Sequence, residues 1–439
     1  LGCVRALLLL LSLVTEGYPY DMSCFVAWGD KLAAEGPAAF YSEGYFADYP
    51  PGYLWVLGLV GAVRAALHIA YESKWTYFLL ALVPSLCDCG LAWLVYRTAK
   101  RSGRGVKEHT ALVLTAFTAF NPLMLFDTGV WKQIDGAFAL PLVLCFVLLE
   151  QRRYLPAVLY GVALAIKPQA LLFGPVLAVC YLAAITLEKD RLRAFGRCFG
   201  GAALALLPPL LTGLPFFGVV QLIPKLFNKY AGTMSGYPYA TINAFNWLAA
   251  LGGNWKGLEE TVLLGISWQQ LGCFHILLVT AGLAYFAARS VRGGRFSPLL
   301  LAAYYGIGIF TLVHCMHERY MVPGVLLTLL AAAHWNDIRL YAAGVGLSLT
   351  GFINLATVYS LTGSDDEWLT SATSSTVAIL TGLVETVCFV LLIFAVWDIA
   401  RHGHTLALPG TKPETAPPVP APQPKWTRRE GGALLALTA

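Results

Sequence analysis

The chain has 439 residues, of which 57% are hydrophobic and only 13% are charged, and its formal net charge is +5. A soluble domain usually carries about 25% charged residues, so this composition excludes a chain that folds around one water-soluble core. Apolar stretches of about 17 to 25 residues, long enough to cross a hydrocarbon core of roughly 30 Å, recur as far as about residue 400. The composition therefore predicts an all-α, polytopic transmembrane helical bundle.

The first apolar stretch is shorter than the others. The chain begins with Leu1, and Val4 to Val14 is too short for a full span. We expect a first helix at residues 3–15 that is truncated at its start. A cleaved signal peptide is the alternative interpretation, although no small-x-small cleavage site follows the stretch.

Basic residues predict the orientation, because short cytoplasmic loops are enriched in Lys and Arg. Two hydrophobic segments separate each successive pair of basic loops, so all of these loops can lie on one face of the membrane, which we expect to be cytoplasmic. The basic loops are Lys100 to Lys107, Arg152-Arg153, Lys189 to Arg197, Arg289 to Arg295, Arg339 and Arg401.

The hydrophobic segments predict about twelve spans. Tyr53 to Ala70 is excluded from that count, because a crossing there would place every later basic loop outside. We expect it to be an interfacial or re-entrant helix within a long first extracytoplasmic loop, residues 16–75. The expected spans are 3–15, 76–97, 110–126, 136–150, 154–166, 170–187, 198–216, 262–288, 296–315, 321–335, 340–361 and 374–398.

The domain organisation follows from this pattern. Residues 1–404 are expected to form one transmembrane domain. Residues 405–439 are rich in proline and lack an apolar period, which predicts a disordered cytoplasmic tail.

The first external loop carries two acidic positions, Asp21 and the segment Asp48-Tyr49-Pro50-Pro51. A carboxylate at the membrane surface can take a proton from an acceptor hydroxyl that is held within about 3 Å. The alternative for Asp21 is a solvated carboxylate at a helix end. The alternative for Asp48 is the polar half of a proline turn.

Two further polar clusters fall on the same predicted face. Trp131 to Asp135 includes Lys132 and Gln133, and the Trp alone is typical of an interfacial anchor. In the segment Lys167-Pro168-Gln169, the lysine ammonium either extends toward lipid headgroups or binds a lipid phosphate as a point charge.

The segment from His314 to Pro323 is polar at the mouth of two spans. It resembles a zinc-protease motif, but Met321 stands where the second His would be needed, so that class is excluded. His317, Glu318 and Arg319 remain as adjacent ionisable groups, and a planar guanidinium suits bidentate phosphate binding. The alternative is an Arg-Glu pair that only stabilises a helix end.

The external segment from Tyr237 to Trp247 combines aromatic rings with the amides of Asn243 and Asn246. Rings can stack on sugar C–H faces while amides bond sugar hydroxyls. An interfacial aromatic belt is the alternative interpretation.

In order and spacing, these motifs resemble those of the GT-C glycosyltransferase superfamily. The similarity is greatest to bacterial predicted mannosyltransferases related to the enzyme that adds the second mannose of GPI anchors. It extends from residue 21 to about residue 323. The matching positions are Asp21, Trp28, Asp48 to Pro51, Asn121-Pro122, Trp131 to Asp135, Lys167 to Gln169, Asn243 to Trp247, His317 to Tyr320 and Pro323.

The resemblance implies an inverting transferase that moves a hexose, mannose before glucose, from a polyprenyl-phosphate carrier to an extracytoplasmic acceptor. Asp21 matches the general base, and Asp48 would support it or the acceptor. The implied donor phosphate ligands are Arg319, Lys167, His317 and Lys132. The implied sugar or acceptor ligands are Gln133, Asp135, Glu318, Gln169, Asn243, Asn246 and Tyr49.

No cofactor is implied, although Asp21 and Asp48 together could hold a divalent cation. The expected partners are the donor lipid, membrane lipid and a glycan, lipid-linked or protein acceptor, without nucleic acid. The expected location is the bacterial cytoplasmic membrane.

Two other classes of function remain open. A polytopic transporter or lipid-linked-glycan flippase would suit the number of spans, but such proteins commonly contain two similar halves, which this sequence lacks. A non-catalytic subunit of polysaccharide assembly is the other alternative, and it would tolerate loss of the Asp21 carboxylate.

Overall fold

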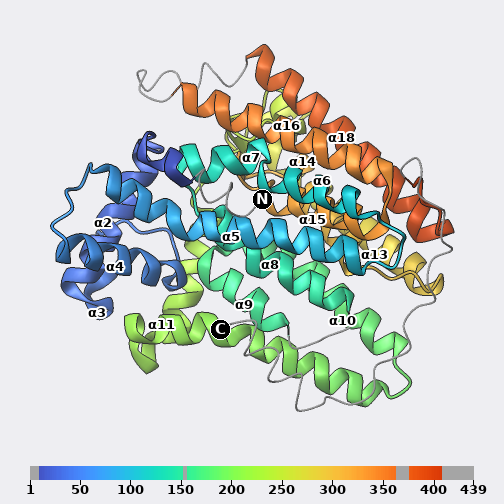
Figure 1. Cartoon of the computed structure of the whole chain (residues 1–439), viewed down its shortest axis with the longest axis horizontal. Helices are drawn as coiled ribbons and strands as arrows, with labels where there is room; N and C mark the ends of the chain where they lie inside the picture. Colours follow the sequence, from blue (N-terminus) through green and yellow to red (C-terminus); the bar gives the residue numbers. More distant parts are fainter. Residues whose placement is uncertain (1–8, 152–155, 362–374, 408–439) are drawn as a thin grey trace.

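The computed structural model describes residues 9–151, 156–361 and 375–407. It is helical almost throughout (Figure 1). The described residues also form two small sheets. In one, β1 (Thr241–Ile242) pairs in parallel with β4 (Met316–His317), and in the other β2 (Thr261–Leu263) pairs antiparallel with β3 (Ile266–Ser267).

Helices make up most of the described residues. In chain order they are η1 (Leu9–Leu13), α2 (Pro19–Glu35), α3 (Pro37–Phe40), α4 (Pro51–Ala66), α5 (Lys74–Arg101), α6 (Glu108–Ala119), α7 (Pro122–Leu125), η2 (Phe126–Trp131), α8 (Asp135–Glu150), α9 (Ala157–Ile166), η3 (Pro168–Phe173), α10 (Gly174–Leu187), α11 (Arg191–Ser235), α12 (Trp247–Ala250), α13 (Trp268–Arg292), α14 (Pro298–Leu312), α15 (Val322–Trp335), α16 (Ile338–Ser360) and α18 (Thr376–His402).

The predicted all-α class is confirmed. Within the described residues, seven helical stretches are long and apolar enough to cross a membrane, which is compatible with an integral membrane protein. They are Lys74–Arg101, Glu108–Trp131, Pro168–Leu187, Arg191–Met234, Trp268–Arg292, Ile338–Ser360 and Thr376–His402. Four shorter apolar helices, α4, α9, α14 and α15, accompany them.

The centre of the bundle is formed by α14 and α15, which are buried on all sides (Figure 1). A helix that is apolar around its whole circumference belongs in such a core. Gly306 and Gly324 allow the two helices to approach closely. A Cβ atom added at Gly324 would lie 3.1 Å from the backbone nitrogen of Ile307.

The first predicted external loop is a packed helical unit, in which α2 and α4 lie side by side (Figure 1). Gly29 and Gly61 meet where the two helices cross, since a Cβ atom at Gly61 would lie 2.3 Å from the Gly29 carbonyl oxygen. Arg64 on α4 is buried and contacts Asp30 on α2 at 2.5 Å. The helix expected from Tyr53 to Ala70 is present as α4, and its position relative to a membrane stays a prediction.

Several predicted boundaries were wrong. The span expected at 262–288 begins with the β2–β3 hairpin, and its helix, α13, starts only at Trp268. The span expected to end at 216 does break close to that position, at Gly218, whose φ of 65° and ψ of 169° are not helical, but a second helical stretch of α11 follows to Ser235 where a loop was expected. The span expected at 110–126 lies within the apolar helical stretch Glu108–Trp131, which is interrupted before Pro122 because the residue that precedes a proline avoids helical geometry.

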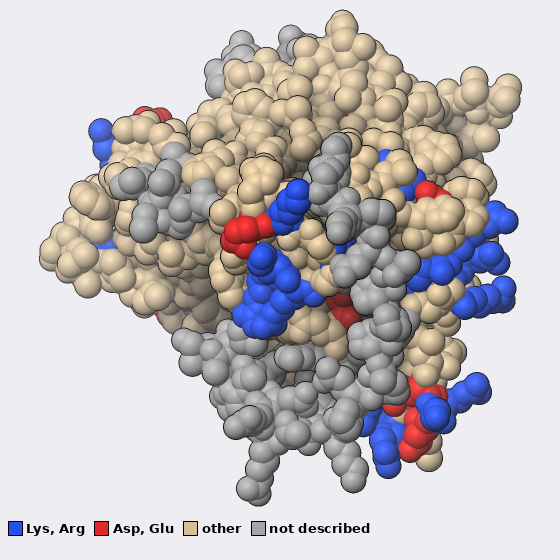
Figure 2. All heavy atoms as spheres, turned by 45° about the vertical axis from the view of Figure 1, so that its right-hand side comes forward, with Lys and Arg blue, Asp and Glu red and all other residues tan. Residues whose placement is uncertain are grey.

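Basic residues gather at one end of the bundle. The C-terminal ends of α5, α10, α13 and α18 lie at the right of Figure 1. Figure 2 brings this side forward and shows Lys and Arg side chains grouped on it. The arrangement agrees with basic loops on one common face.

The start of the predicted tail is held against the bundle. Leu406 accepts a backbone hydrogen bond from Ile338 at the start of α16, and its own N–H donates to Asp337 at 2.9 Å. Residues 408–439, which contain most of the proline-rich segment, lie outside the described residues.

Candidate functional site

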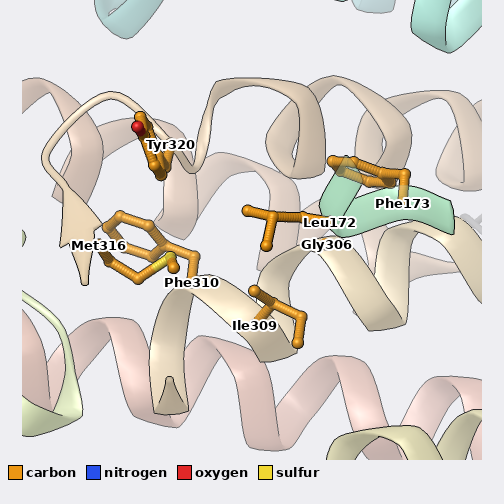
Figure 3. A pocket seen from close by; sticks show the side chains of 7 residues that line it. All are labelled: Leu172, Phe173, Gly306, Ile309, Phe310, Met316 and Tyr320. Atoms are coloured by element: carbon orange, nitrogen blue, oxygen red, sulfur yellow. The ribbon is translucent and has the colours of Figure 1, made fainter. Parts of the chain in front are cut away.

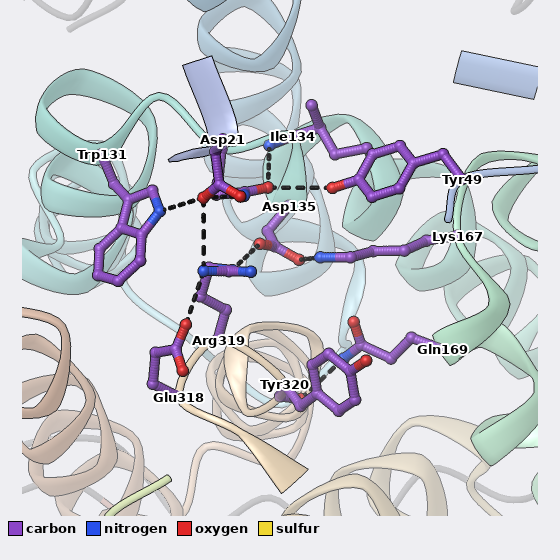
Figure 4. A network of polar contacts seen from close by, with 11 residues as sticks. Asp21, Tyr49, Trp131, Ile134, Asp135, Lys167, Gln169, Glu318, Arg319 and Tyr320 are labelled. Carbon is purple, nitrogen blue, oxygen red and sulfur yellow. Dashed lines mark hydrogen bonds and ion pairs between the residues drawn. The ribbon is translucent and has the colours of Figure 1, made fainter. Parts of the chain in front are cut away.

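Polar side chains meet where helices begin or end, at the starts of α2 and α8, at the end of α9 and in the 313–321 loop (Figure 4). Asp21 lies in the first turn of α2, where the helix dipole favours a carboxylate. Asp135 begins α8, and Lys167 adopts an extended conformation before Pro168, where α9 ends. Arg319 follows β4, which β1 holds in place.

The Asp21 carboxylate is oriented by two donors from one short turn. Trp131 Nε1 and Gln133 Nε2 each donate to Asp21 Oδ2 at 2.6 Å. Lys132 between them has a positive φ of 66°, which turns the chain so that both neighbours face the same oxygen. Tyr49 donates to Gln133 Oε1 at 3.3 Å and orients the amide in turn. The Oδ2 atom of Asp21 is therefore held in position by two hydrogen bonds.

Arg319 lies among three carboxylates. Its Nη1 is 2.6 Å from Glu318 and 3.7 Å from Asp21 Oδ2, and its Nε is 3.7 Å from Asp135 Oδ2. Its guanidinium carbon lies 5.1 Å from the centre of the Trp131 ring, which is cation–π range. Arg319 thus forms ion pairs that link Asp21 to Asp135 and Glu318.

Asp135 and Lys167 form a buried ion pair at 2.6 Å, with the Asp135 side chain fully buried. Arg319 and Lys167 together carry two positive charges and contact the three carboxylates of Asp21, Asp135 and Glu318. When all three are ionised, the cluster has one negative charge in excess.

Some polar atoms in the cluster lack hydrogen-bond partners among the described residues. They are Asp135 Oδ2, Arg319 Nε and Gln169 Oε1, all buried. Gln169 does donate through Nε2 to the Tyr320 carbonyl at 3.0 Å. Buried polar groups in native proteins are usually paired, so these atoms are suited to a polar ligand.

A small apolar pocket, with room for about one water molecule, adjoins the cluster (Figure 3). Tyr320 contributes to both, because its backbone meets Gln169 and its ring lines the pocket. The lining residues are Leu172, Phe173, Gly306, Ile309, Phe310, Met316 and Tyr320. A charged cluster beside an apolar hollow suits a ligand with a polar head and an apolar chain.

The environment shifts the pKa values in the 313–321 loop. Burial raises the pKa of Glu318, while Arg319 opposes the shift. Burial, with Arg319 and Lys167, lowers the pKa of His317 to about 3. His317 is therefore neutral near pH 7 and contributes no positive charge to a phosphate site.

Asp48 lies beside α11 at the edge of the Asp21 cluster. Thr233 on α11 donates to the Asp48 backbone carbonyl at 2.8 Å. Burial raises the pKa of the Asp48 carboxyl group, and nearby Lys229 opposes the shift. Asp21 is also close enough to raise this pKa, and Lys167 is close enough to lower it. No hydrogen bond or ion pair joins Asp48 to Asp21 within the described part of the chain.

Three predicted ligands have structural contacts instead. Lys132 points toward Thr15 and the Gly129 carbonyl, and burial lowers its pKa to about 8. Asn246 caps α12 and donates to the Phe310 carbonyl at 2.8 Å. Asn243 accepts from Trp255 at 2.8 Å. None of these amides or amines contacts the Asp21 cluster.

Two members of this region were assigned no role in the site from the sequence. Trp131 belongs to the segment that matches the family but was not expected to bind anything, yet it bonds Asp21 and stacks on Tyr18 at 4.4 Å. Asp127, in the π-helical turn η2, is fully buried, and neither carboxylate oxygen has a hydrogen-bond partner among the described residues. The rarity of acidic residues in so apolar a segment is the sequence signal that marks Asp127, which was expected on the external face with the other acidic residues but was given no role.

Comparison with known proteins adds no assignment, because no protein-family model and no curated protein matches the chain.

Proposed function

We propose that the chain is an inverting, GT-C type hexosyltransferase that moves mannose, or next glucose, from a polyprenyl-phosphate carrier to an acceptor hydroxyl. The observation that carries the proposal is the oriented Asp21 carboxylate beside Arg319. A base and a phosphate ligand are the two groups that this chemistry requires from the protein.

Asp21 acts as general base. Both of its donors converge on Oδ2, so Oδ1 can face the acceptor. As the acceptor oxygen attacks the anomeric carbon, its proton passes to Asp21. The bond between the anomeric carbon and the phosphate oxygen breaks, and polyprenyl phosphate leaves with the electron pair. Attack opposite the leaving group inverts the anomeric configuration.

Arg319 and Lys167 stabilise the departing phosphate. Both are paired with carboxylates before the donor arrives, so an incoming phosphate has to replace at least one pairing. Glu318 is the carboxylate most easily replaced, because burial already raises its pKa and favours its neutral form. Arg319 then turns its fork toward the phosphate.

The apolar side chains around the pocket contact the first part of the lipid chain. The pocket has to widen for this, because in this structure it has room for about one water molecule. The rest of the lipid chain lies among membrane lipid. The basic end of the bundle faces the cytoplasm, about twelve segments cross the membrane, and the site opens on the extracytoplasmic face.

The test uses purified protein in lipid nanodiscs with polyprenyl-phosphate mannose and glucose, scoring release of polyprenyl phosphate. Asp21→Asn should abolish release without changing the melting temperature. Glu43→Gln, at an exposed acidic position in the same loop, is the matched control and should keep wild-type activity. No release with either donor across several acceptors would overturn the proposal.

The competing function is transport of a lipid-linked glycan, which the buried charged groups could also serve. Reconstituted protein would then move a labelled lipid between leaflets without releasing polyprenyl phosphate.

A further inference from the structure

A second cluster of ligating side chains lies at the opposite end of the molecule from α2, where α18 ends (Figure 1). Asp398 and His402 are one helical turn apart, and Gly403 then turns the chain with a φ of 73°. This turn brings His404 back over Asp398. The Nδ1 atoms of His402 and His404 lie 3.1 Å and 3.6 Å from Asp398 Oδ1.

These distances match the edges of a metal coordination polyhedron. A tetrahedral ion with bonds of about 2.0–2.2 Å to nitrogen and oxygen separates its ligands by about 3.3–3.6 Å. One ligating atom from each of the three side chains lies within 4.8 Å of the others. Within the described ranges, no other group of three such side chains comes this close.

The cluster has the outer contacts that hold metal ligands in place. Asp398 Oδ2 accepts from Arg339 at 2.9 Å, which leaves Oδ1 to the two imidazoles. Asp337 binds the same guanidinium through both carboxylate oxygens, at 3.0 and 2.7 Å, so its positive charge is balanced. Hydrogen bonds of this kind orient ligating carboxylates and contribute to metal affinity.

We propose that Asp398, His402 and His404 bind a divalent transition-metal ion, Zn²⁺ before others, which fastens the chain leaving α18 to the end of the bundle. Two imidazoles and one carboxylate suit Zn²⁺ and disfavour Mg²⁺, which prefers oxygen ligands. The fastened segment includes Leu406, which pairs with Ile338 and Asp337 at the start of α16. By holding the segment from His402 to Leu406, the ion helps to keep the C-terminal end of α18 against the N-terminal end of α16.

The exposure of the site sets its expected strength. His404 has 74% of its side chain exposed, so water can complete the coordination. Arg401 and Arg295 also lie close by, because Arg295 donates to the Arg401 carbonyl at 2.8 Å. An open site near cations should bind more weakly than a closed four-ligand structural zinc site.

The test is calorimetric titration of Zn²⁺ into metal-free protein that carries no polyhistidine tag, in nanodiscs of uncharged lipid. We expect one site, with affinity reduced at least tenfold in His404→Ala and in His402→Ala. His109→Ala, at an exposed histidine outside the cluster, is the matched control and should bind as the wild type does. Because His404 is exposed, its loss should not disturb folding.

Two further measurements complete the test. Co²⁺ should give the intense visible absorption of a low-symmetry, four-coordinate site, and Zn²⁺ should raise the melting temperature of the wild type but not of His404→Ala. Unchanged Zn²⁺ binding in the His402→Ala/His404→Ala double variant would overturn the proposal. Equal competition by Mg²⁺ would overturn it too, because that result would indicate nonspecific binding to acidic groups.

Discussion

The buried ion pair between Asp135 and Lys167 allows stability and function to be separated. Lys167→Met keeps the length of the side chain but leaves Asp135 fully buried without its 2.6 Å partner. Removing one member of a buried pair costs about 3–5 kcal/mol. Arg319 remains 3.7 Å from the other Asp135 oxygen and compensates in part, so we expect the lower end, about 3 kcal/mol.

The double variant Lys167→Met/Asp135→Asn removes both charges together. Replacing both partners of a buried pair is often nearly neutral, so we expect the loss of stability to fall to about 1 kcal/mol. The difference between the two variants, about 2 kcal/mol, reports the cost of leaving the Asp135 charge unpaired. Adding Asp135→Asn alone completes a double-mutant cycle and gives the coupling energy of the pair. Transferase activity should be lost in both variants, since neither retains the Lys167 ammonium for the phosphate.

The assay is denaturant titration in mixed micelles, combined with release of polyprenyl phosphate from nanodisc samples. A double variant as unstable as Lys167→Met would refute the reasoning about the unpaired Asp135 charge. A double variant that folds and transfers sugar at the wild-type rate would refute the role of Lys167 in catalysis.

Three further outcomes follow from single contacts. Arg319→Lys keeps the charge but loses the planar fork, and steady-state kinetics should show kcat lowered by roughly 10²–10³-fold. Gly61→Ala places a Cβ atom 2.3 Å from the Gly29 carbonyl oxygen, and denaturant titration should report a loss of about 1–3 kcal/mol. The pKa of His317 is lowered to about 3, so its contribution to stability is present above pH 6.5 and is lost as pH falls toward 3. In acid titrations, His317→Gln should therefore lose less stability across that window than the wild type does.

The sequence predicted helices well where composition alone determines them, and poorly where a helical stretch contains residues that usually break helices. The break of α11 at Gly218 lies close to the end expected at 216, but the second helical stretch, which runs to Ser235 and contains Pro224, was expected to be a loop. Prolines are tolerated in apolar helices when neighbouring groups satisfy the freed backbone atoms. Propensity along the chain carries no information on those neighbours.

For the site, the sequence predicted which residues take part but not which of them contact one another. Asp21, Gln133, Asp135, Lys167 and Arg319 were all expected to take part, because ionisable and amide groups are rare in so apolar a chain. Their pairing was not predictable, since the bond from Trp131 to Asp21 joins residues 110 positions apart.

Asn243 and Asn246 show the converse. Their residue type suits sugar binding, which stays a prediction, while in the structure Asn246 caps a helix and the side-chain oxygen of Asn243 accepts from Trp255. Residue type alone cannot distinguish an amide that binds a ligand from one that satisfies the backbone.

The excess negative charge of the cluster leads to a last prediction about the donor. A phosphate that takes the place of Glu318 at Arg319 removes the contact that opposes the rise of the Glu318 pKa. The pKa of Glu318 then rises further. Donor binding should therefore be accompanied by proton uptake at any pH between the pKa of Glu318 in the free protein and its pKa in the donor complex. Calorimetry of donor binding in buffers of different ionisation enthalpy measures this uptake directly.

The uptake should disappear in Glu318→Gln, where the side chain is neutral from the start. If the wild type binds the donor without taking up a proton at several pH values, Glu318 stays ionised. The phosphate would then require another source of positive charge, such as a divalent cation.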